Sequence, residues 1–239
     1  MELVFIRTPD GQCGTQVTGP ASGPAIIFVM DAGGIRPGMI AMASRLAEYG
    51  YRVALPDLYY RSGPYAPADP MRALQPGPER DRLASYAHLL TTAAAERDLG
   101  AVLSWLEETG ASRIGCIGYC LGGRHALTAA GAFGERLTAV ASIHAGGYAT
   151  DRPDSPHLRA PAMRAQIYLA VAGEDQWVPR EETERLRAAL QNAGVRFTLE
   201  IYDGVSHGFA VVDLPIFDSA AAERHWQQIS AFFARTLRS

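Results

Sequence analysis

The chain has little cysteine and no long apolar run, and each scarcity narrows the class of protein. Its three cysteines, Cys13, Cys116 and Cys120, are too few and too scattered for a disulfide framework. No apolar run is long enough to span a bilayer. The first eleven residues lack the basic segment and apolar run of a signal peptide. We therefore expect a cytoplasmic protein with free thiols and no membrane association.

Net charge is also low, with 25 acidic residues against 22 basic ones and a formal charge of -3. This balance gives no indication of a nucleic-acid partner or of binding to an anionic membrane. Hydrophobic residues make up 48% and charged residues 20%, which is typical of a globular protein. The 239 residues fit one large α/β domain that buries its own core. The sequence therefore predicts a single domain over residues 1–239, and leaves open whether it is a monomer or a homodimer.

Short apolar runs alternate along the chain with segments of helical periodicity. The predicted strands are Ala25–Met30, Tyr51–Leu55, Arg113–Ile117, Leu137–Ile143, Ala165–Val171 and Phe197–Tyr202. The predicted helices are Gly38–Tyr49, one or two within Leu83–Glu108, Leu121–Gly131, Glu181–Ala193 and Ser219–Leu237. Such alternation predicts an α/β fold with a mostly parallel sheet covered by helices on both faces. Leu3–Arg7 and Gln12–Val17, separated by a Pro-Asp-Gly turn, predict an antiparallel hairpin at one edge.

Two loops are rich in proline and glycine, Pro56–Pro78 and Gly146–Pro161. Ligands of open α/β sheets bind at the carboxyl ends of the strands, where such loops gather. Each loop is either a surface connection or a border of the substrate pocket. Tyr59, Tyr60 and Tyr65 are accordingly expected to line that pocket or to pack their loop against the core.

The segment Gly118-Tyr119-Cys120-Leu121-Gly122-Gly123 lies between a predicted strand and a predicted helix. This is the setting of a nucleophile elbow, with cysteine at the nucleophile position. Glycines two residues before and after the thiol allow neighbouring backbone to pass closely. The helix N-terminus favours both a thiolate and a developing oxyanion. The alternative is a buried cysteine in a tight turn, the kind of role we expect for Cys116 within its strand.

Two further residue types needed for nucleophilic catalysis follow Cys120 in the order found in α/β-hydrolases. Glu174 and Asp175 follow one predicted strand, and either acid is placed to orient a histidine, or simply to sit in a polar turn. His207, in Ser-His-Gly-Phe, follows the next strand and is the candidate base. His144, at another strand end, is interpreted either as a core histidine whose ring nitrogens are hydrogen-bonded or as a residue that contacts the substrate.

These motifs together resemble the dienelactone hydrolases, or carboxymethylenebutenolidases. The segments are VMDAGG, LPDLYYR, GYCLGG, AGEDQWVP and SHGFA, and the resemblance runs from about Ala25 to the C-terminus. It implies an α/β-hydrolase fold and a triad of Cys120, His207 and Asp175, the last preferred over Glu174 because related hydrolases show a GxDxxVP pattern. It also implies that the enzyme needs neither a cofactor nor a metal.

The resemblance further assigns an oxyanion hole to the backbone N–H groups of Leu121 and Ala32. The family places a carboxylate, usually glutamate, just before the second of these groups and near the resting thiol. Here that residue is Asp31, which is one methylene shorter and therefore extends less far toward the thiol.

Family members that bind a dienelactone hold its carboxylate with two arginines. Arg80 or Arg82 matches the first position, but Val211 occupies the second. A bidentate arginine contact is hard to replace. The departure therefore favours neutral esters or lactones as substrates. Tyr119, beside the thiol, and Trp177, near the acid, are further candidates for substrate binding or gating.

The predicted function is hydrolysis of an ester or lactone through a thioester intermediate, with phosphotriester cleavage as a side activity. One alternative is a thiol-dependent dehalogenase or peptidase on the same fold. Another is a binding protein that has lost catalysis, although relics of this kind commonly lose a member of the triad and this chain keeps all three.

Overall fold

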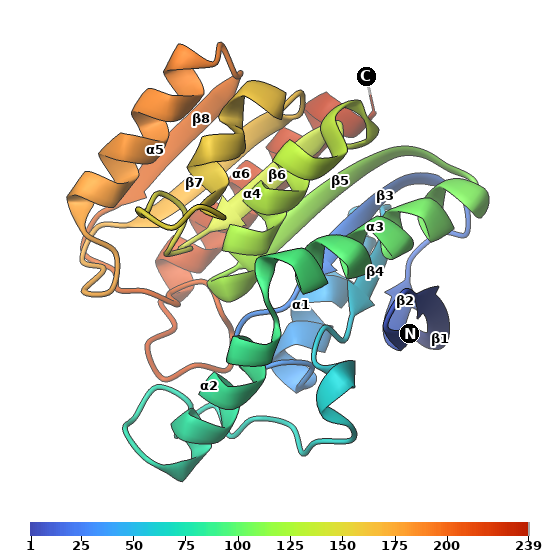
Figure 1. Ribbon diagram of the computed structural model, residues 1–239, viewed down its shortest axis with the longest axis horizontal. Helices are drawn as coiled ribbons and strands as arrows, with labels where there is room; N and C mark the ends of the chain where they lie inside the picture. Colours follow the sequence, from blue (N-terminus) through green and yellow to red (C-terminus); the bar gives the residue numbers. More distant parts are fainter. Residues whose placement is uncertain (239) are drawn as a thin grey trace.

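The computed structural model describes residues 1–238, which form an eight-stranded sheet between two layers of helices (Figure 1). The strands are β1 (Glu2–Thr8), β2 (Gly11–Thr18), β3 (Gly23–Val29), β4 (Arg52–Pro56), β5 (Ala111–Tyr119), β6 (Ala139–Ile143), β7 (Gln166–Ala172) and β8 (Phe197–Tyr202). Their order across the sheet is β1-β2-β4-β3-β5-β6-β7-β8. The β1–β2 and β2–β4 pairs are antiparallel, and all the other pairs are parallel. The predicted fold and its antiparallel N-terminal edge are confirmed.

Six α-helices and three 3₁₀ segments lie between or after these strands in the described chain. They are α1 (Pro37–Glu48), η1 (Tyr60–Ser62), α2 (Pro78–Leu89), α3 (Thr92–Glu108), α4 (Leu121–Phe133), η2 (Gly134–Arg136), η3 (Pro156–Ala162), α5 (Arg180–Asn192) and α6 (Ser219–Leu237). Helices α3 and α4 pack on one face of the sheet, and α1 and α6 pack on the other. Helix α2 extends away from the sheet beyond the carboxyl ends of its strands (Figure 1).

The region predicted as one or two helices is two, α2 and α3. Helix α2 begins at Pro78, five residues before the predicted start, because proline at the first helical position has a fixed φ and needs no N–H partner. Helix α2 ends at Leu89, with Leu90 as its C-cap. The Thr91 side chain then accepts a hydrogen bond from Ala94 N at 3.1 Å and caps the N-terminus of α3.

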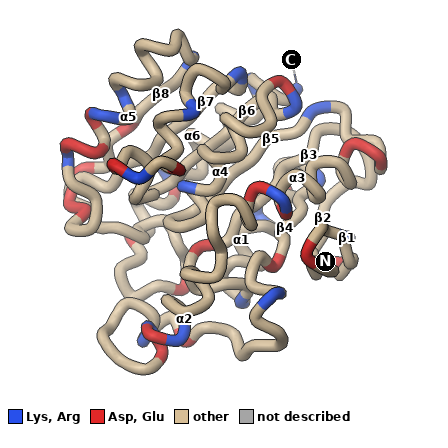
Figure 2. The backbone as a smooth tube through the Cα atoms, viewed as in Figure 1, with Lys and Arg blue, Asp and Glu red and all other residues tan. Residues whose placement is uncertain are grey.

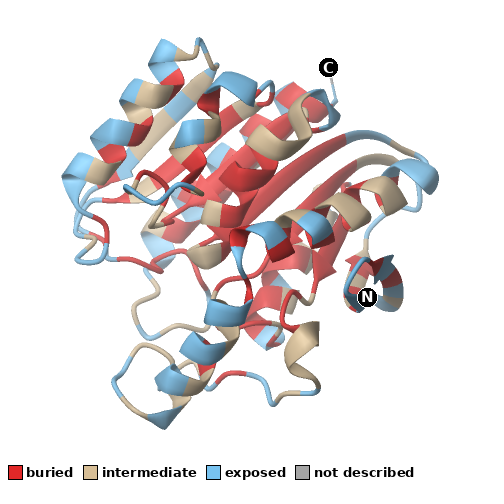
Figure 3. Ribbon diagram, viewed as in Figure 1, coloured by how far each residue is buried: buried red, intermediate tan, exposed pale blue. Residues whose placement is uncertain are grey.

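Strands β3 to β7 are largely buried, and they read as nearly continuous apolar runs because helices cover both faces (Figure 3). Charged residues of both signs lie on helices and loops, and β3, β6 and β7 contain none (Figure 2). The buried apolar residues form one continuous cluster that extends from Ile6 to Leu237. On this basis we propose that the chain folds as one domain.

Two glycines allow β5 and α4 to meet at the sharp turn that contains Cys120. A Cβ atom on Gly118 would lie 2.1 Å from the carbonyl oxygen of Gly122. A Cβ atom on Gly122 would lie 2.4 Å from the carbonyl oxygen of Met30. Both obstacles are backbone, which cannot move aside as a flexible side chain does. The prediction that these glycines permit close backbone approach is therefore confirmed.

Gly118→Ala should lower the free energy of unfolding by about 1–3 kcal/mol, because the added methyl group overpacks a rigid turn. Urea denaturation measures the change. Gly14→Ala is the matched control, since its Cβ would meet only side chains, at 3.6 Å and 3.7 Å, and should change stability by less than about 0.5 kcal/mol. Equal stability of the two variants would show that the turn tolerates a side chain.

Candidate active site

Cys120 lies between β5 and α4 with a positive φ of 53°, an unusual conformation for a residue with a side chain. Its N–H donates a hydrogen bond to the carbonyl oxygen of Ile143 in β6, at 3.0 Å. The side chain is partly exposed, whereas Cys13 and Cys116 are fully buried. Burial raises the pKa of the Cys13 thiol to about 12 and raises that of Cys116 as well. Cys120 is therefore the thiol best placed to react.

Asp175 and His207 meet at the carboxyl ends of β7 and β8. Asp175 Oδ2 accepts a hydrogen bond from His207 Nδ1 at 2.7 Å, and Asp175 Oδ1 accepts one from Trp177 N at 3.0 Å. Both side chains of the His–Asp pair are more than nine-tenths buried. Glu174, the alternative acid, is exposed. The geometry thus pairs His207 with Asp175 and fixes the imidazole so that Nε2 is available for chemistry.

Charge in the site favours a protonated His207. Burial by itself lowers the pKa of His207, but the electrostatic interaction with Cys120 and the hydrogen bond to Asp175 outweigh burial and raise the pKa to about 10. Within residues 1–238, Nε2 makes no hydrogen bond of acceptable geometry. The thiol and the imidazole are therefore close enough to interact electrostatically.

The two backbone N–H groups assigned to an oxyanion hole are both unpaired in the described structure. Leu121 is the first residue of α4, and the N–H groups of a first helical turn have no partner within the helix. Ala32 N also donates no hydrogen bond, while its carbonyl oxygen accepts one from the Tyr59 hydroxyl at 3.1 Å. The loop is thus fixed through its carbonyl, which leaves the N–H free to bind an anion.

Asp31 belongs to a buried ion-pair cluster that the sequence did not reveal. Arg36 Nη1 and Nη2 donate to the two carboxylate oxygens of Asp31, at 2.6 Å and 2.8 Å. Arg36 Nε and Nη2 also donate to Asp213, at 3.0 Å and 3.1 Å. Gly33 N donates to Asp31 Oδ1 at 2.8 Å. Asp31 is thereby held by Arg36, and a role in gating the thiol remains a proposal that this geometry does not favour.

The Arg36 cluster joins two loops that border the thiol, the one containing Ala32 and the one that follows His207. Arg36 is 2% exposed. A Cβ on Gly33 would lie 2.5 Å from Arg36 Nη1, and one on Gly38 would lie 2.1 Å from the Asp213 carboxylate. Two further glycines are therefore needed to admit the cluster. In the sequence, the only indication of this cluster is the charged residue Arg36 between Gly-Gly-Ile and Pro-Gly.

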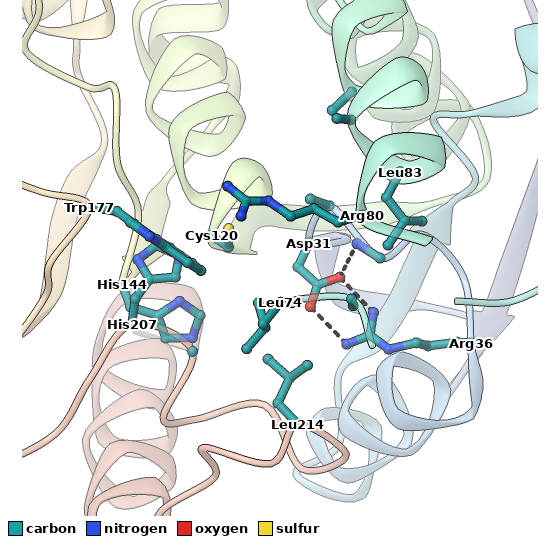
Figure 4. Close-up of a pocket in the computed structure, with 16 residues that line it drawn as sticks. Asp31, Arg36, Leu74, Arg80, Leu83, Cys120, His144, Trp177, His207 and Leu214 are labelled. Atoms are coloured by element: carbon teal, nitrogen blue, oxygen red, sulfur yellow. Dashed lines mark hydrogen bonds and ion pairs between the residues drawn. The ribbon is translucent and has the colours of Figure 1, made fainter. Parts of the chain in front are cut away.

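A cavity of about 290 Å³ opens over Cys120, His207 and Asp31 (Figure 4). Helix α2 contributes one stripe of side chains at helical spacing, and small apolar residues dominate the wall. The lining residues are Asp31, Ala32, Gly33, Arg36, Ala73, Leu74, Arg80, Leu83, Ala84, Ala87, Cys120, His144, Trp177, His207, Gly208 and Leu214. The loop Pro56–Pro78 thus borders the cavity through Ala73 and Leu74.

Several of the expected substrate contacts are corrected by this arrangement. Arg80 lines the cavity, but Arg82 pairs with Glu79 at 2.8 Å outside it. Trp177 lines the cavity as expected. Tyr119 does not, because it is fully buried and its hydroxyl is 2.9 Å from His225 Nε2.

Val211 does not reach the cavity as the sequence interpretation expected, and of the two roles left open for the loop tyrosines the structure supports packing. Val211 is fully buried, and Leu214 of the same loop reaches the cavity in its place. Tyr59 and Tyr65 pack behind the Ala32 loop with their ring centroids 6.0 Å apart. The Tyr60 hydroxyl donates a hydrogen bond to Asp98 Oδ1 at 3.0 Å. None of the three tyrosines lines the cavity, so their role is packing.

No described helix is long and apolar enough to cross a membrane. Likewise, residues 1–238 contain no group of three His, Cys, Asp or Glu side chains arranged to hold a metal ion.

A cysteine at a strand–helix turn, followed along the chain by an acid and a histidine that meet above the same sheet edge, defines an α/β-hydrolase. The dienelactone hydrolase family model matches residues 13–237, and the chain belongs to this family. The enzyme is accordingly a hydrolase acting on esters or lactones.

Relatives and solved structures extend this similarity. The carboxymethylenebutenolidase of Rhodococcus opacus is 30% identical over 219 residues, covering 90% of this chain and 82% of that protein. A candidate dienelactone hydrolase from Klebsiella pneumoniae superimposes with a TM-score of 0.84 at 23% identity, over 98% of both chains. A dienelactone hydrolase-like promiscuous phosphotriesterase from metagenomic libraries superimposes with a TM-score of 0.75 at 20% identity, also over 98% of both. At this level of identity, the two superpositions show that the fold is shared and nothing more.

Arg36→Leu should lower the free energy of unfolding by roughly 3–5 kcal/mol, because it leaves the buried Asp31 carboxylate without its partner. Arg185→Leu is the control, since the Arg185–Asp151 pair is exposed and should contribute less than about 1 kcal/mol. Urea denaturation of both variants gives the comparison. A loss as small as that of the control would mean that Arg36 does not hold the two loops together.

Proposed function

We propose that the enzyme cleaves carboxylic esters and lactones with Cys120 as nucleophile, His207 as general acid and base, and Asp175 as the residue that orients His207. The observation that carries the proposal is the position of Cys120. Its thiol opens into the cavity beside a His207 ring that Asp175 holds at 2.7 Å. A protonated His207 at neutral pH is the partner that a reactive thiolate requires.

In the acylation step, the thiolate forms a C–S bond to the acyl carbon, and the carbonyl electrons move to oxygen. The N–H groups of Leu121 and Ala32 stabilise this oxyanion at the N-terminus of α4. The tetrahedral intermediate then collapses, the bond to the leaving oxygen breaks, and that oxygen takes the proton from His207 Nε2. The enzyme is left with a thioester on Cys120 and a neutral imidazole.

In the deacylation step, His207 Nε2 takes a proton from water while the water oxygen attacks the thioester carbon. The same two N–H groups hold the second oxyanion. Collapse breaks the C–S bond and releases the carboxylic acid product, and the thiolate is restored beside the imidazolium. A lactone follows the same course, with the leaving alkoxide remaining part of the product.

The cavity wall favours neutral substrates with activated leaving groups. Ala73, Leu74, Leu83 and Leu214 offer apolar contacts, and the charge of Arg36 is already neutralised by carboxylates. Of the two arginines that line the cavity in the described structure, Arg36 is paired and Arg80 forms no ion pair. We infer that phosphotriesters, neutral and tetrahedral, enter the same cavity as a side activity. The structural neighbour named as a promiscuous phosphotriesterase supports this inference.

Cys120→Ala should lower kcat/KM for an aryl ester by at least about a thousandfold, because the residues of a triad act as a unit. Cys120→Ser should retain a small part of the activity. Iodoacetamide should inactivate the wild type with one alkylated site, Cys120, identified by peptide mass spectrometry. Cys13→Ala, which removes a buried thiol, should remain active and sensitive. Full activity in Cys120→Ala would exclude the proposed mechanism.

Neutral aryl esters should be hydrolysed with a kcat/KM at least about tenfold higher than a dienelactone carboxylate. An unpaired carboxylate in an apolar site costs several kcal/mol, and each 1.4 kcal/mol corresponds to about tenfold. Arg80→Ala should reduce only the residual activity on the anionic substrate, and Arg82→Ala, outside the cavity, should reduce neither. A wild-type preference for the dienelactone that Arg80→Ala removes would instead show that Arg80 suffices to bind the carboxylate.

A further inference from the structure

Cys120 and His144 are the two residues other than glycine with a positive φ in the described chain. They lie at the carboxyl ends of the neighbouring strands β5 and β6, and Cys120 N donates to the carbonyl oxygen of Ile143, the residue before His144. His144 N in turn donates to Ala170 in β7 at 2.7 Å. Such conformations carry strain, cluster at functional sites and persist only where the surroundings impose them. His144 is thus held by the same edge of the sheet as the nucleophile.

The ring of His144 packs directly against the candidate base. Its centroid is 5.2 Å from that of His207, and the rings are tilted by 59°. Trp177 packs on His207 as well, with a centroid separation of 4.9 Å. His144, Trp177 and His207 all line the cavity (Figure 4). The His207 ring therefore has two aromatic neighbours, contributed by two different loops.

His144 is 1% exposed, and neither of its ring nitrogens has a hydrogen-bond partner in the described structure. The titratable groups that face it are His207, His225 and Tyr119. Burial, and then the neighbouring His207 and His225, hold the pKa of His144 well below its ordinary value. The ring is consequently neutral, and it packs beside a protonated His207 without repelling it. Because neither ring nitrogen has a partner, the contact between His144 and His207 is one of ring packing.

We propose that His144 is a positioning residue, which holds the His207 imidazole in register with Cys120 by packing against its ring. This role rests on the proposed function of His207 as general acid and base. Asp175 holds one nitrogen of His207, and a single hydrogen bond does not by itself restrict the tilt of the ring about it. Packing by His144 restricts the tilt, so that Nε2 stays directed toward the reacting atoms. The strained backbone of His144 is what brings its ring to this position.

Two substitutions distinguish the contribution of the His144 ring from that of its two nitrogens. His144→Phe keeps an aromatic ring of similar size and removes both nitrogens. His144→Asn removes the ring and keeps a residue that tolerates a positive φ. His88→Asn, the same change at an exposed position of α2 that is not part of the cavity wall, is the matched control. Circular dichroism and thermal unfolding establish which variants fold.

For an aryl ester, His144→Asn should lower kcat at least about tenfold and change KM less than about threefold, because the base is misdirected while the cavity remains. It should also shift the pH profile of kcat/KM. His144→Phe should stay within about threefold of the wild type and keep the wild-type pH profile, as the control should. Rescue by phenylalanine identifies packing as the role, and a general loss of structure would not produce it.

An unchanged kcat in a folded His144→Asn variant would overturn the proposal. So would a His144→Phe variant that loses as much activity as His144→Asn or has a shifted pH profile, since the nitrogens would then act in the reaction. If His144→Asn does not fold, a folded His144→Phe variant whose activity falls more than about threefold, or whose pH profile shifts, still overturns the proposal. Failure of the proposed function is separate, because it would appear as wild-type activity that survives alkylation of Cys120.

Discussion

The active site depends on one close backbone contact, between β5 and the first turn of α4. The carbonyl of Gly122 occupies the space that a side chain at Gly118 would need. This contact folds the chain sharply enough to give Cys120 its positive φ and to leave Leu121 N unpaired at the start of the helix. The thiol, the helix N-terminus and an unpaired N–H group are thus placed together by backbone geometry, before any other loop contributes.

The remaining groups arrive because parallel strands end at a common edge. Asp175 and His207 follow β7 and β8, and Ala32 follows β3. The Arg36 cluster then ties the Ala32 loop to the loop after His207 through contacts between residues 177 positions apart. Because the cluster is buried and charged, each of its members requires the others, and the two sides of the cavity are held in one arrangement.

Most of the fold and the members of the candidate triad were accessible from the sequence. Strands and helices differ in the period of their apolar residues, and the elbow motif fixes where to look for an acid and a histidine. Contacts that depend on which way a side chain points were not accessible. Tyr119 adjoins Cys120 in sequence, but successive residues of a strand face opposite sides, so Tyr119 packs toward His225 on α6. Val211 was misplaced for a related reason, since local turns decide that Leu214 faces the cavity. Arg36 and Asp213 were missed because their pairing is long-range and neither belongs to a local pattern.

Helix α2 forms one wall of the cavity, yet among its residues Leu83 alone is buried. Its other inward contact is made by Tyr86, which packs against Tyr59 and Tyr65, and much of the remaining surface of α2 is exposed (Figure 3). Because few interior contacts constrain the residues of α2, mutations on this helix can accumulate at little cost to folding. Substitutions at the cavity-lining positions of α2 are therefore able to alter the shape of the substrate cavity while leaving the residues around Cys120 unchanged.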